Sequence, residues 1–328
     1  MEKYWLNFNA MRQLVICFII SFFAMKTFAQ NDLNDASLVK KLPGFTNRYA
    51  TVNGVKLHYV TGGSGKPLVL LPGWPETWWS YHKMMPLLAK NYQVIVVDIR
   101  GMGSSDKPET GYDKKTMAGD IYELIHQLGY RQVFMCGHDI GSMVAFSFAA
   151  NHPDATLKLV MLDIPHPDES WLKIPMIPAI GKITDKIDED HAFQWWFAFH
   201  QVKDMPEELM LGRVQIENDW IFHYLLYDET AVSPFDRSVY VNAYDSKNGI
   251  RAGYAWYQAF GQDIEDDKNY QPVQMPVLGI GGPAYKRLQA YLSVKTTNLT
   301  MLRAEGSGHF IPEEKPAETA AQIITFLQ

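Results

Sequence analysis

Short apolar runs that end in turn residues recur along the chain and alternate with segments of helical periodicity. Nearly unbroken apolar runs of this length are typical of strands that are covered on both faces, as in a parallel sheet. Between Thr116 and Leu128 the apolar residues recur at helical spacing, and Gly129 follows as a helix-ending residue. The alternation predicts an α/β fold with a mostly parallel sheet. The predicted strands are KPLVLLPG (66–73), YQVIVVDIRG (92–101), QVFMCG (132–137), LKLVMLDIP (157–165), MPVLGIGG (275–282) and LTMLRAEGSGH (299–309).

This alternation is interrupted once, from about Pro165 to Gln262. Trp, Phe, Tyr and Met residues are frequent there, in segments whose pattern is typical of helices rather than strands. A helical block inserted into an α/β chain predicts a cap over the sheet. The pair Asn53-Gly54, between two β-rich runs, predicts a hairpin near the start. We therefore predict a first part of the core over residues 31–165, a helical cap over 166–262 and a second part of the core over 263–328.

The first 30 residues have the features of a secretory signal peptide. In MRQLVICFIISFFAMKTFAQ (11–30), a basic residue precedes an apolar run from Leu14 to Ala24 that is too short to span a bilayer comfortably. We expect cleavage near Ala29 or Gln30 and an exported protein, with an uncleaved anchor as the alternative. The mature chain would keep Cys136 alone, so it could form no internal disulfide.

The composition limits the partners of this chain. With 328 residues, 47% of them hydrophobic, it can bury a full core. The formal net charge of -6 shows no excess of basic residues, which argues against binding to nucleic acid or to anionic membrane surfaces. The oligomeric state stays open between a monomer and a homodimer, and the substrate has to be identified from a site.

One strand-to-helix junction carries unusual chemistry. In MCGHDIGSMVAF (135–146), an apolar strand leads into Gly137-His138-Asp139-Ile140-Gly141 and a helix follows. The small residues permit a tight turn that leaves the middle side chain exposed at the carboxyl edge of the sheet. In the nucleophile elbow of serine hydrolases, a Ser occupies this middle position. Asp139 is therefore a candidate nucleophile.

Two further segments lie where such a nucleophile needs them. GSGHFIPEEKP (306–316) places His309 in a glycine-flanked loop after the last predicted strand, a position suited to a general base. LPGWPETWWSY (71–81) follows an early strand, so the backbone N–H groups of Trp74 and Ile140 could face the same edge. Two such donors would form an oxyanion hole.

Four segments in order, PGWPETWWSY, DIRGMGSSDKP, GHDIGS and GSGHFIPEEKP, resemble an α/β-hydrolase of the epoxide hydrolase and haloalkane/haloacetate dehalogenase branch, closest to the epoxide hydrolases. The resemblance runs from about residue 48 to 327 and implies an α/β-hydrolase fold with a helical cap. It implies that Asp139 is the nucleophile, that His309 activates water, and that the backbones of Trp74 and Ile140 form the oxyanion hole.

A general base needs an orienting acid, which the family places after the sixth or the seventh strand. The later loop, GGPAYKRLQAYL (281–292), contains no carboxylate. The earlier strand ends in MLDIPHPD (161–168), so we expect Asp163 to be the partner of His309. Asp168 is the second candidate for this orienting acid, and Asp163 would then serve only as a helix N-cap.

An aspartate nucleophile indicates a substrate that is opened at a saturated carbon. A serine would form an ether that the site could not hydrolyse, whereas an aspartate forms an ester whose carbonyl belongs to the enzyme. Water activated by His309 could attack that ester, and the oxyanion hole would stabilise the tetrahedral intermediate on Asp139. This chemistry implies no cofactor and no metal.

The cap is expected to hold the leaving group. GYAWYQAF (253–260) resembles the family's segment with a ring-opening tyrosine, which points to Tyr257 as hydrogen-bond donor. In QWWFAFHQV (194–202), Trp196 stands where epoxide hydrolases have a second donor, His or Tyr, and His200 lies one turn further on. An indole donates a hydrogen bond to an epoxide oxygen or a halide but cannot protonate it. An apolar pocket wall is the alternative role for these aromatic residues.

Three departures affect the expected substrate. Haloalkane dehalogenases usually follow the nucleophile with a Trp, and haloacetate dehalogenases with arginines, but this chain has Ile140 and Met143. Pro72 stands where the oxyanion motif commonly begins with His. Carboxylate recognition is therefore not expected, and the sequence predicts an epoxide hydrolase acting on a small apolar epoxide with water. The alternatives are a dehalogenase of the same mechanism and, more remotely, a non-catalytic ligand-binding α/β-hydrolase.

Overall fold

The computed structural model describes residues 32–328, so the predicted signal peptide, residues 1–30, lies outside the described residues. Within the described part of the chain, the strands form one eight-stranded sheet in the order β1-β2-β4-β3-β5-β6-β7-β8. The first two pairs, β1 with β2 and β2 with β4, are antiparallel, and all later pairs are parallel. The strands are β1 (Phe45–Val52), β2 (Val55–Gly63), β3 (Lys66–Leu71), β4 (Tyr92–Asp98), β5 (Val133–His138), β6 (Thr156–Leu162), β7 (Val277–Gly281) and β8 (Leu299–Arg303).

This sheet confirms the predicted fold class, and each of the six predicted runs forms one of the strands β3 to β8. The predicted hairpin is also present. Asn53 and Gly54 connect β1 to β2 with φ values of 50° and 77°, in the left-handed region that such two-residue turns require.

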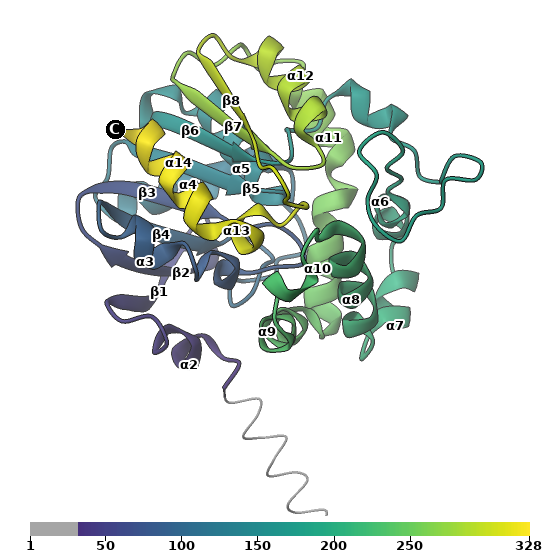
Figure 1. Cartoon of the computed structure of the whole chain (residues 1–328). Helices are drawn as coiled ribbons and strands as arrows, with labels where there is room; N and C mark the ends of the chain where they lie inside the picture. The colour runs from purple at the N-terminus through teal and green to yellow at the C-terminus, as the bar shows by residue number, and fades with distance from the viewer. Residues whose placement is uncertain (1–31) are drawn as a thin grey trace, which may run out of the picture.

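Helices cover both faces of the sheet, while the cap helices form a separate group beside it (Figure 1). The predicted helix before Gly129 is confirmed as α4 (Lys114–Gln127), which begins where Asp113 accepts a hydrogen bond of 2.8 Å from the N–H of Thr116. The other core elements are α2 (Asp35–Val39), η1 (Trp78–Tyr81), α3 (Met85–Leu88), α5 (Ile140–Asn151), η2 (Pro153–Ala155), α12 (Tyr285–Lys295), α13 (Ile311–Glu314) and α14 (Pro316–Leu327).

The cap is formed by the chain between β6 and β7. The predicted cap boundary at 262 falls inside helix α11. This helix is attached to the core, because the Asp263 carboxylate accepts a 2.8 Å hydrogen bond from the N–H of Lys114 and pairs with its Nζ at 2.7 Å. The elements of this segment are η3 (Glu169–Lys173), α6 (Trp195–Gln201), α7 (Met205–Met210), α8 (Val214–Leu225), η4 (Glu229–Ala231), α9 (Pro234–Tyr244), α10 (Lys247–Gln258) and α11 (Phe260–Asp267).

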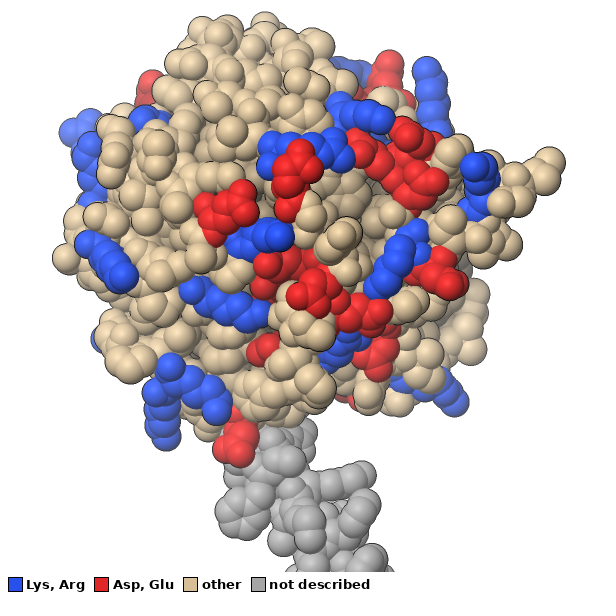
Figure 2. Space-filling model, viewed as in Figure 1, with Lys and Arg blue, Asp and Glu red and all other residues tan. Residues whose placement is uncertain are grey.

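The distribution of charges on the surface and the state of the cysteine in the core can be compared with what the composition predicts. On the face shown in Figure 2, acidic and basic side chains are interspersed. Cys136 is buried in β5 and is a free thiol, as expected. Among residues 32–328, no helix combines the length and the apolar character needed to cross a bilayer.

The parallel part of the sheet positions the predicted site residues. Trp74 follows β3, Asp139 follows β5, Asp163 follows β6 and His309 follows β8. Because the carboxyl ends of parallel strands meet at one edge of a sheet, side chains that are far apart in the sequence converge there.

The close packing of α5 against β3 predicts opposite effects for two glycine-to-alanine substitutions. A Cβ at Gly141 would lie 2.1 Å from the carbonyl oxygen of Leu71, so Gly141→Ala should lower the free energy of unfolding by about 2–3 kcal/mol. A Cβ at Gly119, within α4, would meet nothing within 4 Å, so Gly119→Ala should raise this free energy by about 0.5–1 kcal/mol. Urea unfolding of both variants measures the two changes, and effects of the same sign would contradict this packing.

Candidate active site

Asp139 lies on a tight turn between β5 and α5. Its φ of 51° is in the left-handed region, which residues other than glycine rarely adopt. The flanking glycines make this turn sterically feasible, since a Cβ at Gly137 would lie 2.1 Å from the carbonyl oxygen of Gly141. The turn holds the Asp139 carboxylate at the carboxyl edge of the sheet, where 8% of the residue is exposed.

His309 lies between two carboxylates. Its Nδ1 is 2.7 Å from Oδ2 of Asp163, and its Nε2 is 3.7 Å from Oδ1 of Asp139. Asp163 also accepts hydrogen bonds from the N–H groups of Gly282 (2.8 Å) and Ala284 (3.1 Å). These contacts keep the Asp163 carboxylate turned toward the imidazole, as a triad requires.

The rival acid has a different place in the structure. Asp168 caps η3 by accepting a hydrogen bond of 2.9 Å from the N–H of Ser170. The structure therefore brings Asp163, and not Asp168, to His309.

The loop after β3 supplies one of the two expected oxyanion donors. The N–H of Trp74 donates a hydrogen bond of 2.9 Å to Oδ2 of Asp139. Ile140 is the first residue of α5, and the first N–H groups of a helix have no partner within the helix. Its position agrees with the expected second donor, and its contact with the oxyanion stays a prediction.

A cavity of about 160 Å³ opens above these residues and is lined by both core and cap. Asp139, Asp163 and His309 lie on the core side, together with Trp74. The cap contributes mostly apolar side chains, several of them aromatic, which is typical of a site for a compact organic molecule. These cap residues include Trp171, Trp196, Phe197 and Tyr257.

Tyr257, on α10, lies on the cavity wall as expected and is 3% exposed. Its ring meets that of Trp74 edge-on, with 5.9 Å between the centroids. Burial raises the pKa of Tyr257 well above its ordinary value, and the negative charge of Asp139 adds to the shift. The phenol is therefore held protonated and can donate a hydrogen bond into the cavity.

Trp196 and His200 differ in their relation to the cavity. Trp196 lines it, a position compatible both with the expected contact to the leaving group and with the alternative role in an apolar wall. His200 is fully buried and is not among the residues that line the cavity, so its expected contact with the leaving group stays a prediction. Its Nε2 is 2.7 Å from Oε1 of Glu217, and its ring packs edge-on against Tyr257 at 4.5 Å between centroids. His200 thus supports the tyrosine from behind.

Glu76 is a buried residue near the triad that the sequence analysis did not identify. Its only sequence signal is its place two residues after Trp74. Its Oε2 is 3.3 Å from Nδ1 of His138, whose Nε2–H donates a 2.8 Å hydrogen bond to the carbonyl of His309. Burial raises the pKa of Glu76 to about 8, the charge of His309 opposes this shift and that of Asp139 adds to it. Burial also lowers the pKa of His138, so both groups are held neutral behind the triad.

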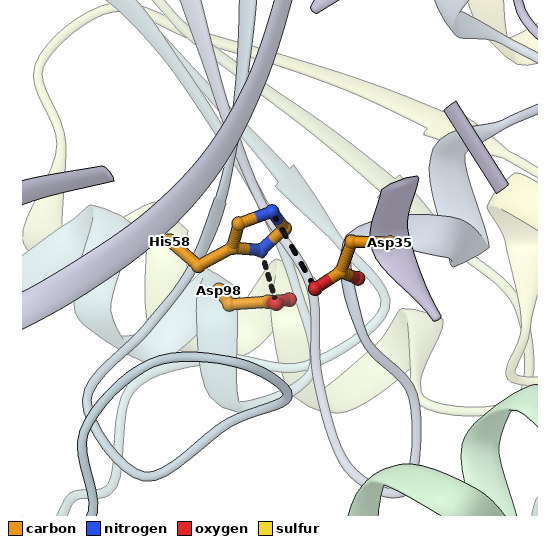
Figure 3. A group of neighbouring side chains, drawn as sticks. All are labelled: Asp35, His58 and Asp98. Carbon is orange, nitrogen blue, oxygen red and sulfur yellow. Dashed lines mark hydrogen bonds and ion pairs between the residues drawn. The ribbon is translucent and has the colours of Figure 1, made fainter. Parts of the chain in front are cut away.

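A second cluster of titratable groups, drawn in Figure 3, contains no residue that lines this cavity. The ligand atoms of Asp35, His58 and Asp98 are within 4.8 Å of one another, close enough to hold a metal ion. Hydrogen bonds already use these atoms, since His58 contacts Asp98 at 2.7 Å and Asn47 at 2.6 Å. Asp98 also accepts a 2.8 Å hydrogen bond from the N–H of Trp78. We interpret the cluster as a structural tie between α2, β2 and the end of β4.

Comparison with known proteins agrees with this geometry. Residues 66–197 match the α/β hydrolase fold family. A soluble epoxide hydrolase of Corynebacterium sp. (strain C12) is 35% identical over 293 residues, which cover 83% of this chain and 93% of that protein. A fluoroacetate dehalogenase of Burkholderia sp. is 28% identical over 302 residues, covering 87% of this chain and 94% of that one. The solved structure of the epoxide hydrolase CorEH without ligand has a TM-score of 0.75 at 33% identity, over 86% of this chain and 98% of that chain.

The fold and the site define an α/β-hydrolase with an aspartate at its elbow. The chain belongs to the α/β-hydrolase superfamily, in the branch that contains the epoxide hydrolases, which confirms the predicted family.

The raised pKa of Glu76 predicts a stability difference that depends on pH. A buried acid of this kind contributes stability below about pH 4.5, its ordinary pKa, and this contribution is lost as the pH rises through about 8. Gln stays neutral, so Glu76→Gln should be as stable as the wild type near pH 5 and more stable by about 1–3 kcal/mol near pH 9. Urea unfolding at both pH values measures the change. The exposed Glu305→Gln variant serves as control, and an equal stability difference at both pH values would refute a buried neutral acid.

Proposed function

We propose that the protein is an epoxide hydrolase that converts an epoxide to a vicinal diol. The observation that carries the proposal is the position of the Asp139 carboxylate, with Oδ2 at the N–H of Trp74 and Oδ1 facing Nε2 of His309. The phenol of Tyr257 lines the same cavity. The similarity to the Corynebacterium epoxide hydrolase supports this assignment.

In the first step, Oδ1 of Asp139 attacks an epoxide carbon and forms an ester, while the C–O bond of the ring breaks. The electron pair of that bond goes to the ring oxygen. The phenol of Tyr257 donates a hydrogen bond and then a proton to this oxygen, because burial keeps it protonated until an alkoxide forms. The ester carbonyl is then Oδ2, which already faces an N–H donor.

In the second step, His309 removes a proton from a water molecule that attacks Cγ of Asp139. Charge develops on Oδ2, where the N–H of Trp74 can stabilise it. Asp163 orients the imidazole and stabilises the imidazolium that forms. As the intermediate collapses, the bond between Cγ and the substrate oxygen breaks and the proton on His309 goes to that oxygen, which releases the diol. The proton left on the Asp139 carboxyl passes through solvent to the phenolate of Tyr257, so one epoxide and one water give one diol.

Dehalogenation by the same nucleophile is a second candidate function. It is favoured by Trp196, whose indole lines the cavity, and by the similarity to a fluoroacetate dehalogenase. In that reaction, a halide would leave with the electron pair, and no proton donor would be needed. An indole can hold a halide by hydrogen bonding, whereas the protonated Tyr257 favours an oxygen leaving group.

Removal of the base should trap the ester intermediate. Incubation of His309→Gln with styrene oxide should give an adduct of the full epoxide mass on Asp139, because alkylation needs no base while hydrolysis does. Intact-protein mass spectrometry followed by peptide mapping measures this.

Two further variants control the trapping experiment. Asp139→Ala in the same background should form no adduct. Tyr257→Phe should slow adduct formation by about 10²–10⁴-fold, the usual contribution of a general acid. An adduct from a halogenated alkane, but none from epoxides, would transfer the assignment to a dehalogenase. No adduct with either compound, together with no diol formation by the wild type, would support a non-catalytic binding protein.

We propose in addition that the protein is exported, with residues 1–30 acting as a signal peptide. This rests on the basic start and the short apolar run of the segment, which lies outside the described residues. N-terminal sequencing of the exported protein should find the mature chain beginning near Gln30. An intact Met1 or Met11 on that protein would contradict cleavage.

A further inference from the structure

The cavity wall carries one arginine that the proposed reaction does not use. Arg287 lies in the first turn of α12, which follows the β7 loop whose N–H groups hold Asp163. Its side chain is half-buried and lines the cavity together with the triad. An arginine stays charged in proteins and presents five N–H donors in a planar fork.

The other charges on this wall are matched by partners. Lys286 pairs with Asp190 at 2.7 Å, and Glu189 pairs with Arg303 at 2.5 Å. Asp163 is engaged by His309 and by backbone N–H groups.

Arg287 is different, because none of the hydrogen bonds and ion pairs found within residues 32–328 includes its guanidinium. Burial lowers its pKa, and the charges of Asp163 and Asp168 oppose that shift. An unpaired cation therefore faces a partly desolvated cavity.

Two polar groups of the cap on the same cavity also lack partners. Nε1 of Trp171 and Oε1 of Gln194 are buried and have no hydrogen-bond partner among the described residues. The two residues are 5% and 8% exposed, and both line the cavity. A buried polar group without a partner is destabilising, so a ligand that meets these groups would gain affinity.

We propose that the substrate is an epoxide that carries a carboxylate, which Arg287 binds and which the indole N–H of Trp171 helps to hold. This inference rests on the proposed function and replaces the apolar substrate that the sequence predicts. A carboxylate fits the fork of a guanidinium by accepting two parallel hydrogen bonds.

The other charges of the cavity favour a monoanion. Asp139, Asp163 and Glu189 line the same space of about 160 Å³, so a phosphate dianion would be repelled more strongly than a carboxylate. The positions just after the nucleophile, Ile140 and Met143, carry no arginine, which is why the sequence does not predict carboxylate recognition. Arg287 reaches the cavity from the first turn of α12, about 150 residues later and beyond the cap.

The test compares neutral and anionic epoxides that otherwise have the same shape. The probes are para-carboxystyrene oxide and phenylglycidate, which differ in the spacing between carboxylate and epoxide, each with its neutral carboxamide. The wild type should turn over at least one acid with a kcat/KM at least about tenfold above that of its carboxamide. In Arg287→Gln, this ratio should fall at least about tenfold, mainly because KM for the acid rises. Arg287→Lys should retain part of the preference for the acid.

A matched control removes one positive charge elsewhere. Arg131→Gln, at an exposed position that does not line the cavity, should keep the wild-type ratio. A wild-type ratio of one or below for both pairs would overturn the proposal. Arg287→Gln lowering acid and carboxamide turnover equally would also overturn it, because Arg287 would then only support Asp163. Turnover of the carboxamides with an adduct on Asp139 would keep the proposed hydrolase function in either case.

Discussion

The close approach of α5 to the sheet is the constraint on which the site depends. Gly137 and Gly141 leave no room for a Cβ, so the helix begins directly at the end of β5 and Asp139 adopts a φ of 51°. This turn directs one carboxylate oxygen to the N–H of Trp74 and the other toward His309. The nucleophile, the oxyanion donor and the base are therefore arranged by a single tight junction.

Burial then sets the protonation states around that junction. Burial keeps the proton on the phenol of Tyr257 and on the carboxyl of Glu76, and it keeps the imidazole of His138 neutral. Asp163, in contrast, receives hydrogen bonds from His309 and two backbone N–H groups. Hydrogen-bond donors thus face the carboxylates of the triad, and the proton for the leaving oxygen is kept on the cap side of the cavity.

The cavity joins two parts of the chain that differ in what they contribute. The core supplies the nucleophile, the base and its orienting acid, and the cap supplies the proton donor Tyr257; together they explain how an alkyl–oxygen bond is opened and an ester hydrolysed. The cap aromatics and the loop leading into α12 supply the remaining wall. Trp171, Gln194 and Arg287 present polar groups without partners there, so this wall is the part of the site that would distinguish one epoxide from another.

The sequence by itself determined the α/β sheet, the elbow with Asp139, and the loop with His309, because each is encoded in short local patterns of apolar runs, glycines and motif residues. Only the tertiary structure decided which other side chains reach the cavity. Trp196 and His200 lie one turn apart on α6, yet one lines the cavity and the other is buried behind Tyr257. Arg287 carries no motif, and its role depends on long-range packing that brings α12 to the cap, which no local pattern encodes.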